Sequence, residues 1–204
     1  MVTFKTHAAD DSDCAPDVNN PGPVIVQVTQ RISPLEEDPT KTREEITQLV
    51  GRPASGVFHE EGVDFNIQYE VALSSLQTPP MVCMLVKRVE GVITVKKMAI
   101  YTAKEYPPGS CRYVEIMAHE RVHDQIFTTL IDLYAERLRE SIRRLDLPSA
   151  DHPWSVSSLD EGTQRVRTLL IDVTQSVSNH FNQEYDRRTN EFHEQALHKH
   201  SQCQ

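Results

Sequence analysis

One five-residue segment of the chain has the residue types and the spacing of a metal site. His119-Glu120-Arg121-Val122-His123 fits the pattern HExxH. On a helix, residues four apart lie on the same side, so both imidazoles can reach one Zn²⁺ at about 2.0–2.1 Å. Glu120 would project beside the metal, where a carboxylate can take a proton from bound water and pass it to a leaving amine. The segment predicts a catalytic zinc site.

The two histidines also have a plainer interpretation. Core imidazoles at i and i+4 can be satisfied by hydrogen bonds, with Glu120 as a surface charge. Two desolvated imidazoles without partners would cost roughly a few kcal/mol, so something must compensate them. A metal is the simpler compensation, and zinc is the cofactor that we expect.

A catalytic zinc requires a third protein ligand and leaves the fourth place for water. The stretch from about Leu159 to Leu197 has the spacing of a long helix, with an apolar stripe that runs to Phe181. Continued beyond it, the stripe brings polar side chains inward: His180, Glu184, Arg188 and Glu191. We expect the third ligand among them. His193 and Asp186 would project to the opposite side of an unbroken helix.

Two predictions on this stripe have alternatives. Glu184 and Arg188 would form an exposed ion pair if the stripe left the core near the end of the helix. Tyr185 flanks the stripe, and its hydroxyl could donate a hydrogen bond to an oxyanion during catalysis, or its ring could simply pack. The sequence leaves both alternatives open.

The elements that must position these residues predict an α+β fold. Runs of β-branched or alternating residues predict about four strands, and Glu90-Gly91 predicts a hairpin between the last two. The predicted strands are 24–32, 65–73, 82–89 and 92–102. This small strand-rich half would pack on two long helices.

Capping signals place the helices. Thr42 and Glu45 form a capping-box pattern for a short helix that ends near Gly51. Ser110 can cap a helix that carries both site histidines and runs to about residue 143. Ser158 begins a second capping box, for the helix from about 159 to 197.

Length and composition favour a soluble globular protein. The chain has 204 residues, of which 38% are hydrophobic and 25% charged, so one domain over residues 23–204 is expected. Residues 1–22 contain several aspartates and prolines and few apolar residues, which predicts a flexible arm.

Charge and hydropathy exclude two classes of partner. A net charge of −9 with scattered basic residues argues against nucleic acid. No stretch approaches the roughly 20 apolar residues of a membrane span, and residues 1–13 lack the apolar core of a signal peptide. We therefore expect either a cytosolic protein or a chain numbered from after a removed signal. The four cysteines are too far apart for a CxxC metal site, and they could form two disulfides or remain thiols.

With these residues in view, the chain resembles the bacterial family of predicted secreted zinc-dependent proteases. That family combines a small half of strands and a helix, an HExxH helix that continues into an Ala-x-x-Leu-Arg-like stretch, and a late YDxxTxHG motif. The matching stretches here are 119–124, 135–139 (AERLR) and 185–191 (YDRRTNE). The resemblance covers about residues 24–195, and only its HExxH part is specific.

The resemblance implies a zincin-like fold and a site at the late motif. Glu191 occupies the position of the motif's histidine, and Glu for His is an acceptable exchange of zinc ligand. Glu184 is the second candidate. Phe192 replaces the motif's glycine. The resemblance also implies a periplasmic or secreted protein, which favours a disulfide between Cys83 and Cys111.

The expected function is a zinc metallopeptidase acting on a peptide or protein substrate. Zinc would polarise the scissile carbonyl, Glu120 would activate the water, and the edge of strand 92–102 would present itself to an extended peptide. The alternatives are a non-catalytic zinc-containing binding or structural protein, and a zinc amidase acting on cell-wall peptides. Glu120 favours catalysis, because a structural zinc site needs no general base.

Overall fold

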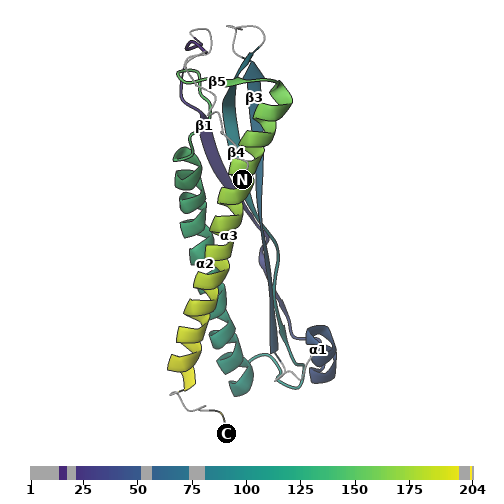
Figure 1. Ribbon diagram of the computed structural model, residues 1–204. Helices are drawn as coiled ribbons and strands as arrows, with labels where there is room; N and C mark the ends of the chain where they lie inside the picture. The colour runs from purple at the N-terminus through teal and green to yellow at the C-terminus, as the bar shows by residue number, and fades with distance from the viewer. Residues whose placement is uncertain (1–13, 18–21, 52–56, 74–80, 198–202, 204) are drawn as a thin grey trace, which may run out of the picture. The chain divides into compact units, whose positions relative to one another are not determined.

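Three helices and one sheet make up the part of the chain that the computed structural model describes, residues 14–17, 22–51, 57–73, 81–197 and 203. In chain order the elements are β1 (Ile25–Ile32), β2 (Leu35–Asp38), α1 (Arg43–Val50), β3 (Val57–Leu73), β4 (Val82–Thr102), α2 (Cys111–Arg143), β5 (Trp154–Val156) and α3 (Leu159–Leu197), as Figure 1 shows. This mixture of helices and sheet confirms the predicted fold class in its coarse form.

Local signals set the helix boundaries. At α1 the Thr42 hydroxyl accepts a hydrogen bond from the backbone N–H of Glu45, whose carboxylate accepts one from the N–H of Thr42. Gly51 ends the helix in the left-handed conformation, with φ of 69°. At α3 the Ser158 hydroxyl accepts from the N–H of Glu161, 3.2 Å away. The three predicted helices are therefore confirmed. They could be predicted because a cap and its partner are only a few residues apart in the sequence.

The predicted hairpin at Glu90-Gly91 is wrong, because β4 is one continuous strand of 21 residues. A Cβ on Gly91 would lie 3.1 Å from the Val28 side chain and 3.2 Å from that of Leu138. The glycine therefore provides space for close packing inside a strand and not a turn.

β4 is also the central strand of the sheet. The strand order is β1-β4-β2, and β3 and β5 also pair with β4. β2 runs parallel to β4, with Leu35 opposite Met98, whereas β5 is antiparallel, with Val82 opposite Val156. The prediction that residues 92–102 offer a free edge to a peptide is therefore wrong. β2 and β5 were not predicted, because runs of four and three residues are too short for an alternating pattern to be distinguished.

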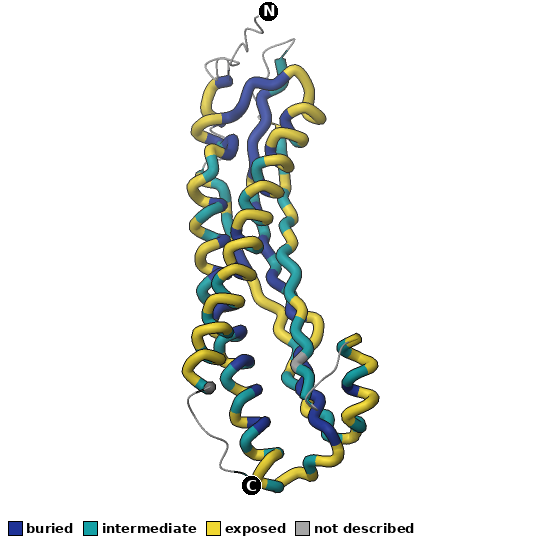
Figure 2. The backbone as a smooth tube through the Cα atoms, turned by 60° about the horizontal axis from the view of Figure 1, so that its bottom comes forward, coloured by how far each residue is buried: buried dark blue, intermediate teal, exposed yellow. Residues whose placement is uncertain are grey.

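Contacts divide the chain into two compact units, each described by itself. Unit 1 comprises Met1–Thr29, Asn66–Val92 and Glu136–Val177, and unit 2 comprises Gln30–Phe65, Ile93–Ala135 and Ser178–Gln204. Figure 2 shows the buried positions, which recur along α2 every three or four residues. Whether residues 23–204 fold as one domain, as the sequence predicts, is not decided by this division and stays a prediction.

The core of unit 1 is apolar. The fully buried Met84 of β4 packs so closely on α3 that a Cβ on Gly162 would lie 1.9 Å from its sulfur. In unit 2, α1 places Ile46 against Ala99, Tyr101 and Ala103. The two long helices of unit 2 lie side by side and share aromatic contacts, such as Phe127 with Phe181 at 5.7 Å between ring centroids.

Each unit contains one disulfide, and the predicted pairing is wrong. Cys14 is bonded to Cys83 in unit 1, and Cys111 to Cys203 in unit 2. The pairing of Cys83 with Cys111 followed from the implied export and assumed that a strand cysteine lies beside the start of the site helix, but the two residues belong to different units.

Little of the predicted N-terminal arm is described. Residues 1–13 and 18–21 lie outside the described residues. Of the remainder, Cys14 is held by its disulfide, and the Asp17 N–H donates a hydrogen bond to the Ala150 carbonyl at 2.8 Å. Within the described part of the chain, none of the helices qualifies as a membrane span.

Candidate metal centre

The HExxH segment lies on α2, as predicted, and brings its two histidines together. Residues four apart on a helix are neighbours on one side, and the Nε2 atoms of His119 and His123 lie 3.2 Å apart. His123 is buried and His119 is half-buried. Burial and the nearby His193 lower the pKa of His119, which favours the neutral imidazole that a metal requires.

A third histidine completes this cluster. His193, on α3, places its Nε2 atom 3.0 Å from that of His123. One ligand atom from each of the three residues lies within 4.8 Å of the others. We call His119, His123 and His193 the histidine cluster. These three residues could hold a metal ion.

The spacing of the nitrogens can be compared with that around a tetrahedral metal. For metal–nitrogen bonds of 2.0–2.1 Å and tetrahedral angles, the ligand nitrogens are about 3.3 Å apart. The two observed separations, 3.2 Å and 3.0 Å, lie close to this value. Hydrogen bonds alone would explain the cluster less well, because a neutral imidazole has only one N–H to donate. These two separations and the presence of a third imidazole within reach fit a single ion.

Phe192 packs against the histidine cluster and restricts its rings. Its ring centroid lies 4.7 Å from that of His119 and 5.2 Å from that of His123. In the resembled motif this position is glycine. Here the phenyl ring fills the space beside the imidazoles and covers part of their surface, which limits the rotamers that the two histidines can adopt.

Glu120 is buried on the same turn of α2 as His119. It is only 7% exposed, and burial raises its pKa to about 7. A carboxyl group whose pKa lies near neutrality can both accept and release a proton at physiological pH. The predicted general base therefore has the environment that this chemistry requires.

Unit 2 contains a second carboxyl group, Glu61, that interacts electrostatically with Glu120. Burial raises the pKa of Glu61, on β3, to about 7, and the charges of Asp124 and Glu120 add to this effect. Tyr185 forms a side-chain hydrogen bond with Glu61, and burial raises the pKa of its hydroxyl. The Tyr185 ring also packs edge-on against Phe127, with 5.6 Å between centroids. Of the two predicted roles for Tyr185, packing is thus observed, and its hydroxyl has a partner within the protein.

The two acidic candidates for third ligand lie elsewhere. Glu184 accepts hydrogen bonds from Arg187 at 2.7 Å and Arg188 at 2.9 Å, and these bonds lower its pKa to about 2. Glu191 is exposed and pairs with Arg187 at 2.5 Å. The structure brings neither carboxylate into the histidine cluster. The ion pair of Glu184 with Arg188, which the sequence left open as an exposed pair, is observed with both side chains half-buried.

The prediction that His193 points away from α2 is wrong, although α3 is unbroken as assumed. The inward-facing row of α3 passes through the buried Phe181 and the half-buried Phe192, whereas Glu191 is exposed. His193 and Glu191 flank Phe192 at about 100° on either side, because successive helical residues are rotated by that angle. The flank of His193 faces the HExxH histidines. The available signal was the residue type, since histidine is a common metal ligand.

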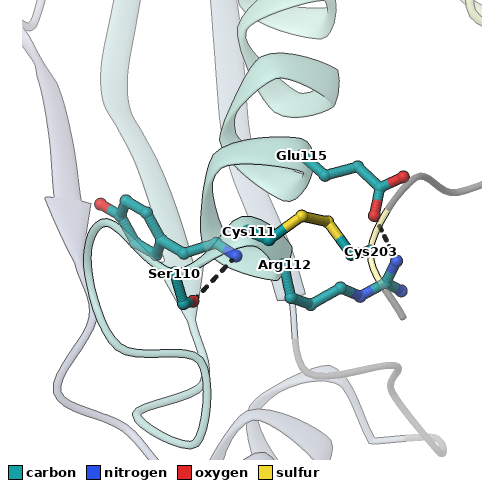
Figure 3. Close-up of a disulfide and its surroundings, with 6 residues drawn as sticks. Ser110, Cys111, Arg112, Glu115 and Cys203 are labelled. Carbon is teal, nitrogen blue, oxygen red and sulfur yellow. Dashed lines mark hydrogen bonds and ion pairs between the residues drawn. A yellow bond between two sulfur atoms is a disulfide. The ribbon is translucent and has the colours of Figure 1, made fainter.

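A cavity of about 550 Å³ adjoins the histidine cluster. His119 forms part of its wall, and the disulfide between Cys111 and Cys203 forms another part. Figure 3 shows this disulfide at the first turn of α2, where Arg112 and Glu115 form an ion pair at 2.8 Å. The candidate metal centre is therefore next to a space that another molecule can enter.

Comparisons with known proteins add no assignment, because no family model, curated protein or solved structure matches the chain.

Proposed function

We propose that the protein is a zinc-dependent hydrolase that cleaves peptide bonds, with zinc held by His119, His123 and His193. The convergence of three histidine side chains carries this proposal, because the two Nε2 separations from His123 are close to those around a tetrahedral ion. Three ligands leave the fourth place for water or substrate, which is the arrangement of catalytic and not of structural zinc. A zincin-like fold and membership of the zinc-protease family are part of the same proposal.

Glu120 is the general base of the proposed reaction. Bound zinc would lower the pKa of water and polarise the scissile carbonyl. Glu120 accepts one proton from the water as the oxygen adds to the carbonyl carbon, and donates it to the amine as the C–N bond breaks. Its burial and raised pKa support both transfers. A non-catalytic zinc protein would have no use for a buried carboxylate at this position.

The disulfides support export as part of this proposal. Two disulfides account for all four cysteines of the chain. Such bonds persist in oxidising compartments and are rare in the cytosol. We infer that the protein works in the periplasm or outside the cell.

Metal analysis and one conservative substitution test the function. We expect about one zinc per chain in protein purified without a metal-affinity tag. Glu120→Gln keeps the size of the side chain and removes the base, so hydrolysis of a peptide mixture should fall by about 100-fold or more with zinc retained. Glu191→Gln, on the exposed side of α3, is the matched control and should keep full activity. Zinc-loaded protein in which Glu120→Gln is as active as the wild type would contradict the proposal.

A further inference from the structure

The cavity beside His119 has a mostly apolar lining. The proposed zinc chemistry gives this cavity no role. Its side chains come from the first turns of α2 and the end of α3: Val114, Ala118, Val122, Phe192 and Ala196. Its volume, about 550 Å³, lies within the range of pockets that hold ligands. Val114 is 57% exposed, an unusual exposure for a large apolar side chain in a helix that packs on its other side.

The position of the cavity relative to the candidate metal centre decides what it can hold. His119 belongs to both, so a molecule bound at the metal lies within one side chain of the cavity wall. Val114 precedes His119 by five residues, which is about 7.5 Å along a helix. An extended peptide advances about 3.3 Å per residue. The cavity is therefore within one or two residues of a carbonyl placed at the metal.

We propose that this cavity is a specificity pocket for a large apolar side chain next to the scissile bond of a peptide substrate. The inference rests on the proposed function and adds the substrate class. The apolar walls favour aliphatic or aromatic side chains, because transfer of such a side chain from water to an apolar surface is favourable. The one acidic wall residue, Glu115, is paired with Arg112 and so gives the pocket little preference for a cation.

The first test measures binding to zinc-loaded protein and does not depend on knowing a substrate. Two hydroxamates that differ only in the side chain are compared by calorimetry: acetohydroxamate and 4-methylpentanohydroxamate. Both can ligate zinc, but only the second has a branched chain that can enter the pocket. We expect it to bind roughly 10- to 100-fold more tightly, the range for burial of one aliphatic side chain.

Ala118→Leu tests the pocket itself. Ala118 is exposed on α2, so a larger side chain there can fill the cavity without disturbing the core. The variant should lose the preference for the longer hydroxamate and keep its zinc and its affinity for acetohydroxamate. Ile171→Leu, an exposed position on α3 outside the cavity, is the control and should keep the preference.

The outcomes separate the two proposals. If zinc and acetohydroxamate bind but the longer compound gains nothing, or if Ala118→Leu leaves its gain intact, the pocket inference is overturned and the proposed function stands. If neither hydroxamate binds the zinc-loaded protein, the open coordination place is absent and both proposals fail. Cleavage sites mapped in a peptide mixture provide a second measurement. Leu, Ile, Val, Phe or Met should be enriched beside the cut, and Ala118→Leu should shift the cuts toward Gly and Ala.

Discussion

The two units use the same two long helices for different purposes. In unit 1, α2 and α3 contribute to an apolar core that leaves no space for a Cβ at Gly162. In unit 2, the same helices carry three histidines and two buried or half-buried carboxyl groups, Glu120 and Asp124, whose pKa values burial raises. Buried polar groups lower stability unless they are paired or bound to metal. The contrast is between a unit with an apolar core and a unit that carries the candidate metal centre.

The largest expected effects come from the disulfides, of which each unit has one. They join residues 69 and 92 apart in sequence. Chain-entropy arguments give about 4 to 5 kcal/mol of stabilisation for loops of either length. The double variants Cys14→Ser/Cys83→Ser and Cys111→Ser/Cys203→Ser should therefore lose similar free energies of unfolding, measured by denaturant titration.

The two disulfides should differ in their reaction with a reductant. Cys14 and Cys83 are buried, whereas Cys111 is exposed and Cys203 half-buried. Access controls thiol–disulfide exchange, so the bond of unit 2 should be reduced first. Alkylation followed by mass mapping at intervals gives the order. Simultaneous reduction, or earlier loss of the bond in unit 1, would contradict the expectation.

The next largest effect concerns His193, the proposed third zinc ligand in unit 2. Outer partners of a metal site typically change affinity by about 10- to 100-fold, and loss of a direct ligand should cost more. We expect His193→Ala to weaken zinc binding by more than about 100-fold, or about 3 kcal/mol. Glu191→Ala, two residues away, should bind zinc as the wild type does. Competition with a chelator measures both affinities, and the reverse result would restore Glu191 as the ligand.

The raised pKa of Glu61, in unit 2, predicts that the free energy of unfolding depends on pH. Its pKa is raised from 4.5 to about 7 in the folded protein. Between these values the unfolded chain has lost its proton and the folded one has not, so stability falls as pH rises from about 4.5 to 7. The loss is on the order of 3 kcal/mol at 1.36 kcal/mol for each pKa unit. Glu61→Gln in the metal-free protein should reduce this dependence, and the part that remains belongs to Glu120, whose pKa burial also raises to about 7.

Glu60 is the matched control for this experiment. It is the neighbour of Glu61 on β3, and its hydrogen bond with Lys97 lowers its pKa. Its ionisation is therefore complete well below pH 7, and Glu60→Gln should leave the slope between pH 4.5 and 7 unchanged. Denaturant titrations across this range measure the slopes. A slope that is unchanged in Glu61→Gln would assign the whole dependence to other groups.

The smallest expected effects are the changes in stability when one glycine from each unit is replaced by alanine. Gly162→Ala should destabilise the protein by about 2 kcal/mol, because the added methyl group overlaps with Met84. Gly62→Ala in unit 2 has open space around it and should be neutral or slightly stabilising. Combining Gly162→Ala with Met84→Val should cost less than the sum of the two single changes, as measured by a double-mutant cycle. Strict additivity would show that the two side chains do not meet.

The sequence by itself determined the features that depend on neighbours in the chain. Thr42 and Glu45 specify the start of α1, and Ser158 specifies that of α3, because a cap and its partner are only three residues apart. The HExxH spacing likewise places His119 and His123 on one side of α2, because helical periodicity alone determines that geometry.

Tertiary structure decided the remainder. Helical periodicity places Glu191 and His193 symmetrically about Phe192, and only the packing of α3 beside α2 selects His193. In the same way, Gly91 is compatible with a turn or with close packing, and the side chains of Val28 and Leu138, distant in sequence, select a continuous strand. Each of these outcomes depends on residues about 50 or more positions apart, whose contacts a local pattern does not contain.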